Sequence, residues 1–131
     1  MARVKTEPSP QRLLALQTGE LGEERALRWA EAEGWRLHAQ RLRVAGTEVD
    51  LVLLRPMPGN GMELLLLEVK SSRSAPPEHA ARWSRAQQAR LWRAAEVLVE
   101  QCTASRVQVG LVLVTLGADR ENIQWLRAEP Y

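Results

Sequence analysis

Two apolar segments constrain the fold most, because both are apolar at consecutive positions and therefore need cover on both sides. The first is a run of four leucines at positions 64–67, and the second spans residues 107–116. Strands buried on both faces have this pattern, whereas half-exposed strands alternate. The sequence between them predicts a long helix over residues 78–101. A helix between two such strands indicates a crossover, so we expect a sheet with helices on its faces.

The remaining pattern predicts four further elements and the bounds of the strand that contains the leucine run. We expect a helix from Thr18 to Glu33 that ends at Gly34, and a bulged strand over residues 35–44. Strands at 48–54 and 62–70 flank Pro-Met-Pro-Gly-Asn-Gly, which predicts an antiparallel hairpin, and a short strand follows at 122–126. The order αβββαββ predicts an α/β fold with a mixed sheet of four or five strands flanked by helices. Residues 1–16 are expected to form an irregular or loosely helical N-terminal arm, because Pro8 and Pro10 oppose an early helix, and residues 17–131 a single domain.

Composition excludes several classes of protein. The 131 residues are 45% hydrophobic and 26% charged, as in one ordinary globular domain. Residues 107–116 are too few to span a bilayer and no secretory signal is visible, so we expect a cytoplasmic protein. One cysteine and two histidines cannot form a closed zinc site, so a bound metal would have oxygen ligands. No glycine-rich phosphate loop and no nucleophile elbow occurs.

The distribution of charge permits a phosphate-bearing partner. The net charge is +2, and residues 19–33 hold five glutamates whereas residues 71–93 hold five arginines. Arginine makes bidentate contacts with phosphate, although a run of charge is often only a solvated helix face. The candidate nucleic-acid contacts are the five arginines of the basic run, with two more near the first hairpin: Arg73, Arg82, Arg85, Arg90, Arg93, Arg41 and Arg43.

Asp50, Glu68 and Lys70 form the pattern that best fits catalysis. Side chains alternate along a strand, so Glu68 and Lys70 share one face while Val69 points to the other. Two carboxylates and the backbone carbonyl of Val69 can hold Mg²⁺ or Mn²⁺, and a lysine can orient the attacking water. This chemistry suits phosphodiester hydrolysis. Glu and Lys two residues apart are nevertheless common on strands, so the motif alone is weak.

Two further residues could add to this set, and we also consider one tryptophan of the predicted long helix as a nucleic-acid contact. Glu23 lies in the acidic helix and could add a third metal-binding carboxylate, or only interact with the helix dipole. Gln88 extends the inward stripe of the long helix and needs a polar partner there, unless it lies at the stripe's exposed edge. Trp83 lies just outside the stripe, where packing against the protein is favoured over stacking on an unpaired base.

The chain resembles the YraN-type endonuclease-like family through four segments. These are Gly22-Glu23, residues 47–52 (Thr-Glu-Val-Asp-Leu-Val), residues 67–73 (Leu-Glu-Val-Lys-Ser-Ser-Arg) and residues 87–91 (Gln-Gln-Ala-Arg-Leu). That family is similar to Holliday-junction resolvases of the PD-(D/E)xK nuclease superfamily. The resemblance implies a restriction-endonuclease-like αβββαβ core, with Asp50, Glu68 and Lys70 as metal-binding and catalytic residues. It implies Glu23 as the helix-borne acid and Gln88 as the helix glutamine. Gln87 stands where the family commonly has a lysine.

Three interpretations of the function remain. The first is a metal-dependent endonuclease that acts on branched or structured DNA with Mg²⁺ or Mn²⁺. The alternative is a nucleic-acid-binding or scaffold domain that has the nuclease fold without turnover. A third, simpler interpretation gives the fold no nucleic-acid role. The two-fold symmetry of junctions would favour a homodimer.

Overall fold

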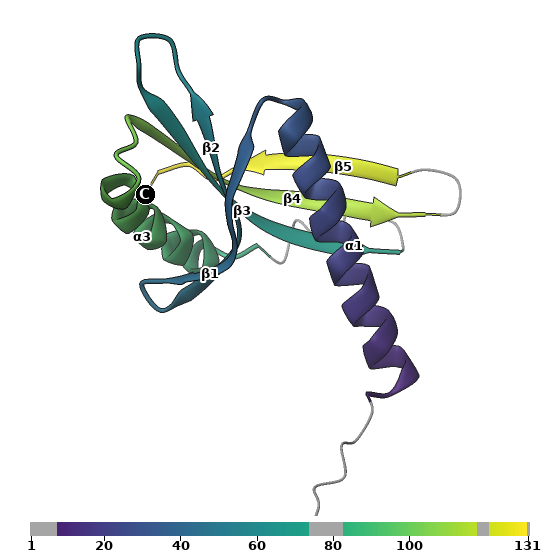
Figure 1. Ribbon diagram of the computed structural model, residues 1–131. Helices are drawn as coiled ribbons and strands as arrows, with labels where there is room; N and C mark the ends of the chain where they lie inside the picture. The colour runs from purple at the N-terminus through teal and green to yellow at the C-terminus, as the bar shows by residue number, and fades with distance from the viewer. Residues whose placement is uncertain (1–7, 74–82, 118–120, 131) are drawn as a thin grey trace, which may run out of the picture.

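The computed structural model describes residues 8–73, 83–117 and 121–130 of the chain. Its elements, in order, are α1 (Pro10–Ala32), β1 (Arg36–Val44), β2 (Thr47–Pro56), β3 (Met62–Ser72), α3 (Arg85–Gln101), β4 (Arg106–Leu116) and β5 (Glu121–Arg127). The strands form one sheet in the order β1-β2-β3-β4-β5, in which only β3 and β4 run parallel. Helix α1 crosses one face of the sheet and α3 lies on the other (Figure 1). The predicted α/β fold with a mixed, helix-flanked sheet is confirmed.

The central strand β3 is covered on both faces, as its run of leucines predicts. Leu65 and Leu67 pack on the α1 side, and Leu64 and Leu66 on the α3 side. All four are at most 1% exposed. Helix α3 connects β3 to its parallel neighbour β4, whose residues are paired from Glu63↔Arg106 to Ser72↔Thr115. The predicted crossover is therefore confirmed, and two apolar layers hold β3 in place.

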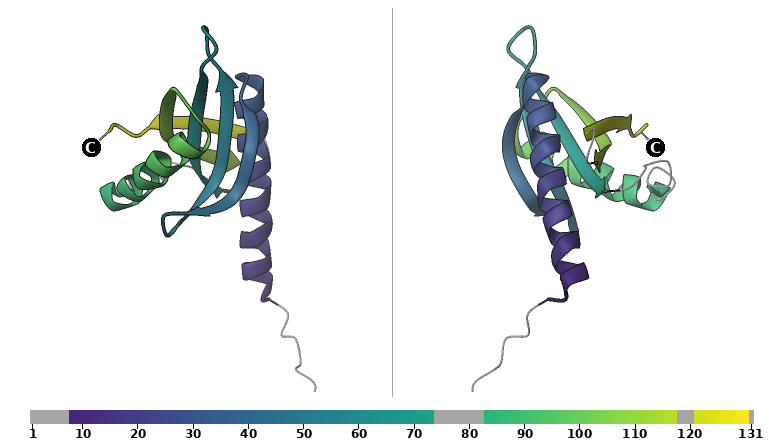
Figure 2. Two further views of the ribbon diagram at one scale, coloured as in Figure 1. Left: turned by 60° about the vertical axis from the view of Figure 1, so that its left-hand side comes forward. Right: turned by 90° about the vertical axis from the view of Figure 1, so that its right-hand side faces the viewer.

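Helix α1 begins at Pro10, so the expected start at Thr18 is wrong. The side chain of Ser9 accepts a hydrogen bond from the backbone N–H of Arg12 at 3.2 Å and caps the helix. Proline is compatible with a first helical turn, because an N–H there has no helical partner. Thr18 instead donates its hydroxyl to the carbonyl of Leu14 at 2.8 Å. The first turns project beyond the sheet (Figure 2).

Helix α3 begins at Arg85, so the prediction of a continuous helix from residue 78 is wrong at Trp83 and Ser84, while residues 78–82 lie outside the described ranges. Ser84 and Gln87 form a capping box, in which the Ser84 side chain accepts the Gln87 N–H and the Gln87 side chain accepts the Ser84 N–H. This reciprocal cap fixes the first turn. Trp83 therefore lies before the N-cap, and its backbone is not part of α3.

Both predicted features of the hairpins are present. The pairing of β1 with β2 shifts register between Leu37 and Ala39, so the expected bulge is confirmed. The antiparallel β2–β3 hairpin turns through Gly59 and Asn60, both with positive φ.

Neither described helix has the length and apolarity needed to cross a bilayer.

Candidate active site

The site is built where β2 and β3 separate. Their backbones are paired from Pro56↔Met62 as far as Leu51↔Leu67, while β3 continues beside β4 to Ser72. Beyond Leu51 the Asp50 carboxylate replaces the backbone ladder, since its Oδ2 accepts the N–H of Val69 at 2.8 Å. Asp50 is thereby held at the point where the two strands part.

Strict alternation along β2 is interrupted at Asp50. Val49 and Val52 both belong to the apolar cluster on the α3 side, whereas Leu51 belongs to the cluster on the α1 side. The adjacent strand is irregular at the same level, because Arg41 in β1 has a φ of 49°. This irregularity lets the Asp50 side chain reach across to the backbone of β3.

Glu68 lies on the α3 side of β3, at its carboxyl-terminal end. Its side chain is half-buried, and Oε2 accepts a hydrogen bond from Nε1 of Trp83 at 3.1 Å. Lys70 follows two residues later with the same parity and is half-buried, opposite Leu113 of β4. The expectation that Glu68 and Lys70 share a face agrees with Leu65, Leu67 and Val69 lying on the α1 side.

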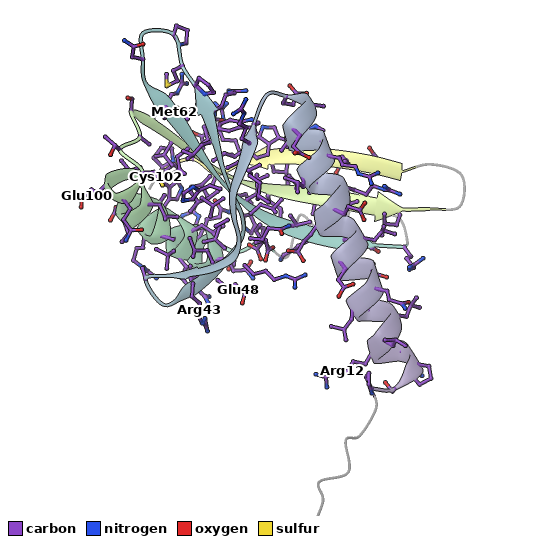
Figure 3. The ribbon with its side chains drawn as sticks, viewed as in Figure 1. Arg12, Arg43, Glu48, Met62, Glu100 and Cys102 are labelled. Atoms are coloured by element: carbon purple, nitrogen blue, oxygen red, sulfur yellow. The ribbon has the colours of Figure 1, made fainter. Side chains whose placement is uncertain are left out.

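Asp50 is a half-buried carboxylate within electrostatic reach of three glutamates. Burial above all, and then the negative charges of Glu23, Glu68 and Glu48, raise its pKa to about 6 against the opposing effect of the Val69 N–H. Glu48 lies opposite Arg43 near the β1–β2 turn (Figure 3). The site therefore concentrates negative charge, and a cation would stabilise its ionised form.

Close packing of α1 on the end of β3 positions Glu23. A Cβ built on Gly22 would clash with Cβ and Oγ of Ser71, so only glycine allows this approach. The Ser71 hydroxyl donates to the carbonyl of Thr18 at 3.1 Å and fixes the same contact. Glu23 follows Gly22 in α1, and its carboxylate forms an ion pair with Arg41 at 2.9 Å. Arg41, a predicted nucleic-acid contact, is thus the partner of a predicted site carboxylate.

Gln88 reaches the site indirectly. Its Nε2 donates to the backbone carbonyl of Trp83 at 3.3 Å, and Trp83 donates its indole N–H to Glu68. Gln88 therefore has a polar partner, but that partner is a backbone carbonyl and not the expected site carboxylate, water or phosphate. The expected packing of Trp83 against the protein is confirmed by its contact with the apolar cluster on the α3 side. The link from Trp83 to Glu68 was not predicted from the sequence, although the Ser84-x-x-Gln87 signature marks where the segment before α3 must turn.

A cavity of about 580 Å³ opens beside Trp83 and Gln88, and Arg85, Trp92 and Arg127 also line it. The other predicted cations are exposed, with Arg90 and Arg93 on α3 and Arg43 near the β1–β2 turn (Figure 3). Arg73 donates to the Thr18 hydroxyl at 2.8 Å. Arg82 lies outside the described residues.

The oxygen atoms of the site fit a divalent metal in part. Oδ1 of Asp50 and Oε1 of Glu68 accept no hydrogen bond from the described residues, so one oxygen of each carboxylate is available. The Val69 carbonyl lies between these residues in sequence. Within residues 8–73, 83–117 and 121–130, however, no three His, Cys, Asp or Glu side chains are grouped closely enough to hold a metal ion. Glu23, bound to Arg41, does not complete such a group.

Comparison with known proteins identifies a family and several relatives that resemble this chain. Residues 22–114 match the model of a family described as "Uncharacterised protein family UPF0102". A UPF0102 protein of Klebsiella pneumoniae is 30% identical over 128 residues, which cover 97% of this chain and 96% of the relative. The UPF0102 protein YraN of Escherichia coli is 37% identical over 76 residues, or 57% of this chain and 54% of YraN. A UPF0102 protein of Rhodopseudomonas palustris is 40% identical over 55 residues, or 42% of this chain and 43% of the relative.

Proposed function

Because the chain belongs to family UPF0102, which confirms its resemblance to the YraN-type proteins, we propose that it is a metal-dependent endonuclease acting on branched or structured DNA. The observation that carries this proposal is the position of Asp50 at the parting of β2 and β3, within electrostatic reach of Glu68. Two acidic groups at such a site, with a lysine on the same strand, suit phosphodiester hydrolysis.

Each residue then has a defined role. Asp50, Glu68 and the carbonyl of Val69 would hold Mg²⁺ or Mn²⁺, which supplies an activated water for attack on the phosphorus atom. Lys70 orients the attacking water or balances the negative charge that develops on the phosphate. Trp83 holds Glu68 through its indole N–H, and Gln88 holds the backbone of Trp83. Glu23 adds negative charge next to Asp50 and keeps Arg41 close to the site.

DNA would be held by the basic surface beside these groups. Arg85 borders the cavity that contains Trp83 and Gln88, and Arg90 and Arg93 are exposed further along α3. Contacts of this kind bind phosphates and supply affinity without sequence preference. Substrate choice would then depend on the shape of the DNA, in agreement with branched or structured substrates.

One observation favours a second function, a nucleic-acid-binding domain without turnover. The described residues do not group three His, Cys, Asp or Glu side chains, and Glu23 is paired with Arg41. A site with only two carboxylates could bind DNA and leave it intact. The two functions differ in whether DNA is consumed and in whether binding responds to metal.

Cleavage of a four-way junction and of single-stranded DNA with Mg²⁺ or Mn²⁺ tests the proposal. We expect Asp50→Asn and Glu68→Gln each to lower the rate by at least about 100-fold, because loss of a group that merely supports a metal ligand already costs 10–100-fold. Glu96→Gln, an exposed acid on α3, is the matched control and should keep full activity. Equal cleavage by wild type and Asp50→Asn would refute the proposed nuclease activity. Metal-independent DNA binding by wild type and by every variant would support the nucleic-acid-binding domain without turnover.

A further inference from the structure

A second cavity lies on the other face of the sheet, away from Asp50. It has a volume of about 340 Å³ and contains Trp29 of α1, Trp35 before β1 and Trp125 of β5. All three tryptophans pack with the apolar cluster on the α1 side, whereas Trp83 and Trp92 pack on the α3 side. Gln108 lines the cavity and donates a hydrogen bond to Glu63, the first residue of β3 that pairs with β4. The candidate site lies toward the other end of β3, where the pairing with β4 ends at Ser72. The cavity therefore lies on the other face of the sheet from Asp50 and Glu68, and Arg127 is the lining residue that it shares with the cavity beside Trp83.

The aromatic wall of this cavity is constructed around a glycine. A Cβ built on Gly110 of β4 would clash with Cζ3 and Cη2 of Trp125, so the indole lies directly over the β4 backbone. Trp125 also contacts Trp29, with ring centroids 5.7 Å apart and planes tilted by 36°. Trp125 is thus held in one orientation, and it is half-buried, with part of its surface lining the cavity.

The guanidinium of Arg55, held by several contacts, also lines the cavity. Arg55 lies over the Trp35 ring at 4.1 Å from its centroid. It donates to Oε1 of Glu63 at 2.8 Å and to the carbonyl of Glu33 at 3.2 Å. Glu63 is only 4% exposed and also accepts a hydrogen bond from Gln108 at 2.7 Å. A planar cation held in this way offers a flat surface on which an aromatic ring can stack.

Arg127 supplies positive charge among the residues that line the cavity. It is exposed, and its side chain makes no hydrogen bond or ion pair within the described part of the chain. With Arg55 already neutralised by Glu63, Arg127 remains to attract an anion. Aromatic cages commonly bind cationic ligands, but Arg127 opposes a cation here. The exposed residue Glu33 also lines the cavity, so the preference for an anion rests on Arg127 alone.

We propose that this cavity binds a nucleotide, with its base against the tryptophans and its phosphate on Arg127. A flat aromatic ring matches the indole and guanidinium walls, the amide of Gln108 can hydrogen-bond a base edge, and Arg127 complements a phosphate. The volume is at the lower end of the range for ligand pockets, about 300–1,000 Å³, which suits one nucleotide. The nucleotide is either a free one or an unpaired residue of a nucleic-acid strand. The inference does not depend on cleavage at Asp50.

The experiment follows the indole N–H signals of the protein by two-dimensional NMR during titration with deoxyadenosine monophosphate, a short oligodeoxyadenylate, adenosine or inorganic phosphate. The chain has five tryptophans, so each signal can be assigned with a Trp→Phe variant. We expect deoxyadenosine monophosphate to move the signals of Trp29, Trp35 and Trp125. Arg127→Gln should weaken this binding about tenfold, as expected for loss of one charge-assisted contact, and leave adenosine binding unchanged.

Matched variants separate this site from the proposed nuclease. Arg28→Gln removes an exposed arginine of α1 that pairs with Glu24, and it should bind as the wild type does. Asp50→Asn should also bind normally, so loss of DNA cleavage does not affect the result. Tighter binding of the oligonucleotide, in competition with the monophosphate, identifies a strand as the source, and binding of the monophosphate alone identifies a free nucleotide. The proposal is overturned if inorganic phosphate gives the same shifts, if only Trp83 and Trp92 respond, or if no ligand moves the three signals.

Discussion

Asp50 lowers the stability of the folded protein whenever it is ionised. The folded state holds its proton up to about pH 6, whereas the unfolded chain releases it near pH 3.8. Between these values the folded state binds more protons, so this residue's contribution to stability falls as pH rises and is lowest above pH 6. Asparagine does not titrate. Relative to wild type, Asp50→Asn should therefore gain about 2–3 kcal/mol between pH 3.5 and pH 7.5.

Urea unfolding of both proteins across this range measures the difference. Glu24→Gln on the exposed face of α1 provides the control, and its stability relative to wild type should change little with pH. The addition of Mn²⁺ at pH 7.5 should raise the stability of wild type and leave Asp50→Asn unchanged, since a bound cation favours the ionised carboxylate. A constant difference between wild type and Asp50→Asn at every pH would show that the pKa of Asp50 is the same in the folded and the unfolded protein.

Two glycines of α1 form a matched pair with opposite expectations. Gly22 touches Ser71 so closely that Gly22→Ala must displace α1 from β3, at a cost of about 1–3 kcal/mol. Gly19 has open space around its Cα, and Gly19→Ala should stabilise the helix by about 0.5–1 kcal/mol. Thermal unfolding tests both variants. If Gly22→Ala were as stable as Gly19→Ala, the close approach that positions Glu23 would not exist in solution.

At the scale of elements, the capping box before α3 connects helix stability to the site. Ser84→Ala removes one acceptor of the reciprocal cap and should cost about 1 kcal/mol. Because Trp83 precedes the cap and donates to Glu68, the same change should also lower activity on DNA. Ser9→Ala removes the corresponding cap of α1, whose first turns project beyond the sheet, and should leave activity intact. If Ser84→Ala and Ser9→Ala lowered activity equally, the cap of α3 would have no particular effect on the site.

The strands were predictable and the helix starts were not, for a physical reason. A doubly apolar run such as 64–67 has few ways to be covered, so its pattern alone predicts a central strand. Helix starts depend on caps, and at both helices a serine cap outweighed the expected boundary. Pro10 is accommodated after Ser9, and Ser84 with Gln87 closes the first turn of α3.

The candidate site was predictable in composition but only partly in geometry. The alternation along β3 placed Glu68 and Lys70 on one side, as expected. The bond between Asp50 and the Val69 N–H joins residues 19 apart, and the ion pair of Glu23 with Arg41 joins residues 18 apart. Contacts at such separations follow from the packing of α1 and from the irregularity of β1. Neither leaves a local signal in the sequence.

The whole molecule divides its chemistry between the two faces of one sheet. The acidic site and the cavity with Trp83 adjoin the end of β3 and the start of α3, while the tryptophan cavity lies on the α1 side. Arg127 of the edge strand β5 lines both cavities. A strand of nucleic acid that crosses this edge could therefore contact both faces, whereas the basic residues of α3 contact only one.

This arrangement predicts how DNA binding depends on salt. Each phosphate contact contributes about one unit to the slope of log K against log salt concentration, so Arg85→Gln and Arg90→Gln should each reduce the slope by about 1. The background for these variants is Asp50→Asn, which on the proposed mechanism would prevent cleavage during a titration with a four-way junction. Arg28→Gln, which removes a cation paired with Glu24 on α1, should leave the slope unchanged. If all three substitutions change the slope equally, the DNA responds to net charge alone and α3 is not its binding surface.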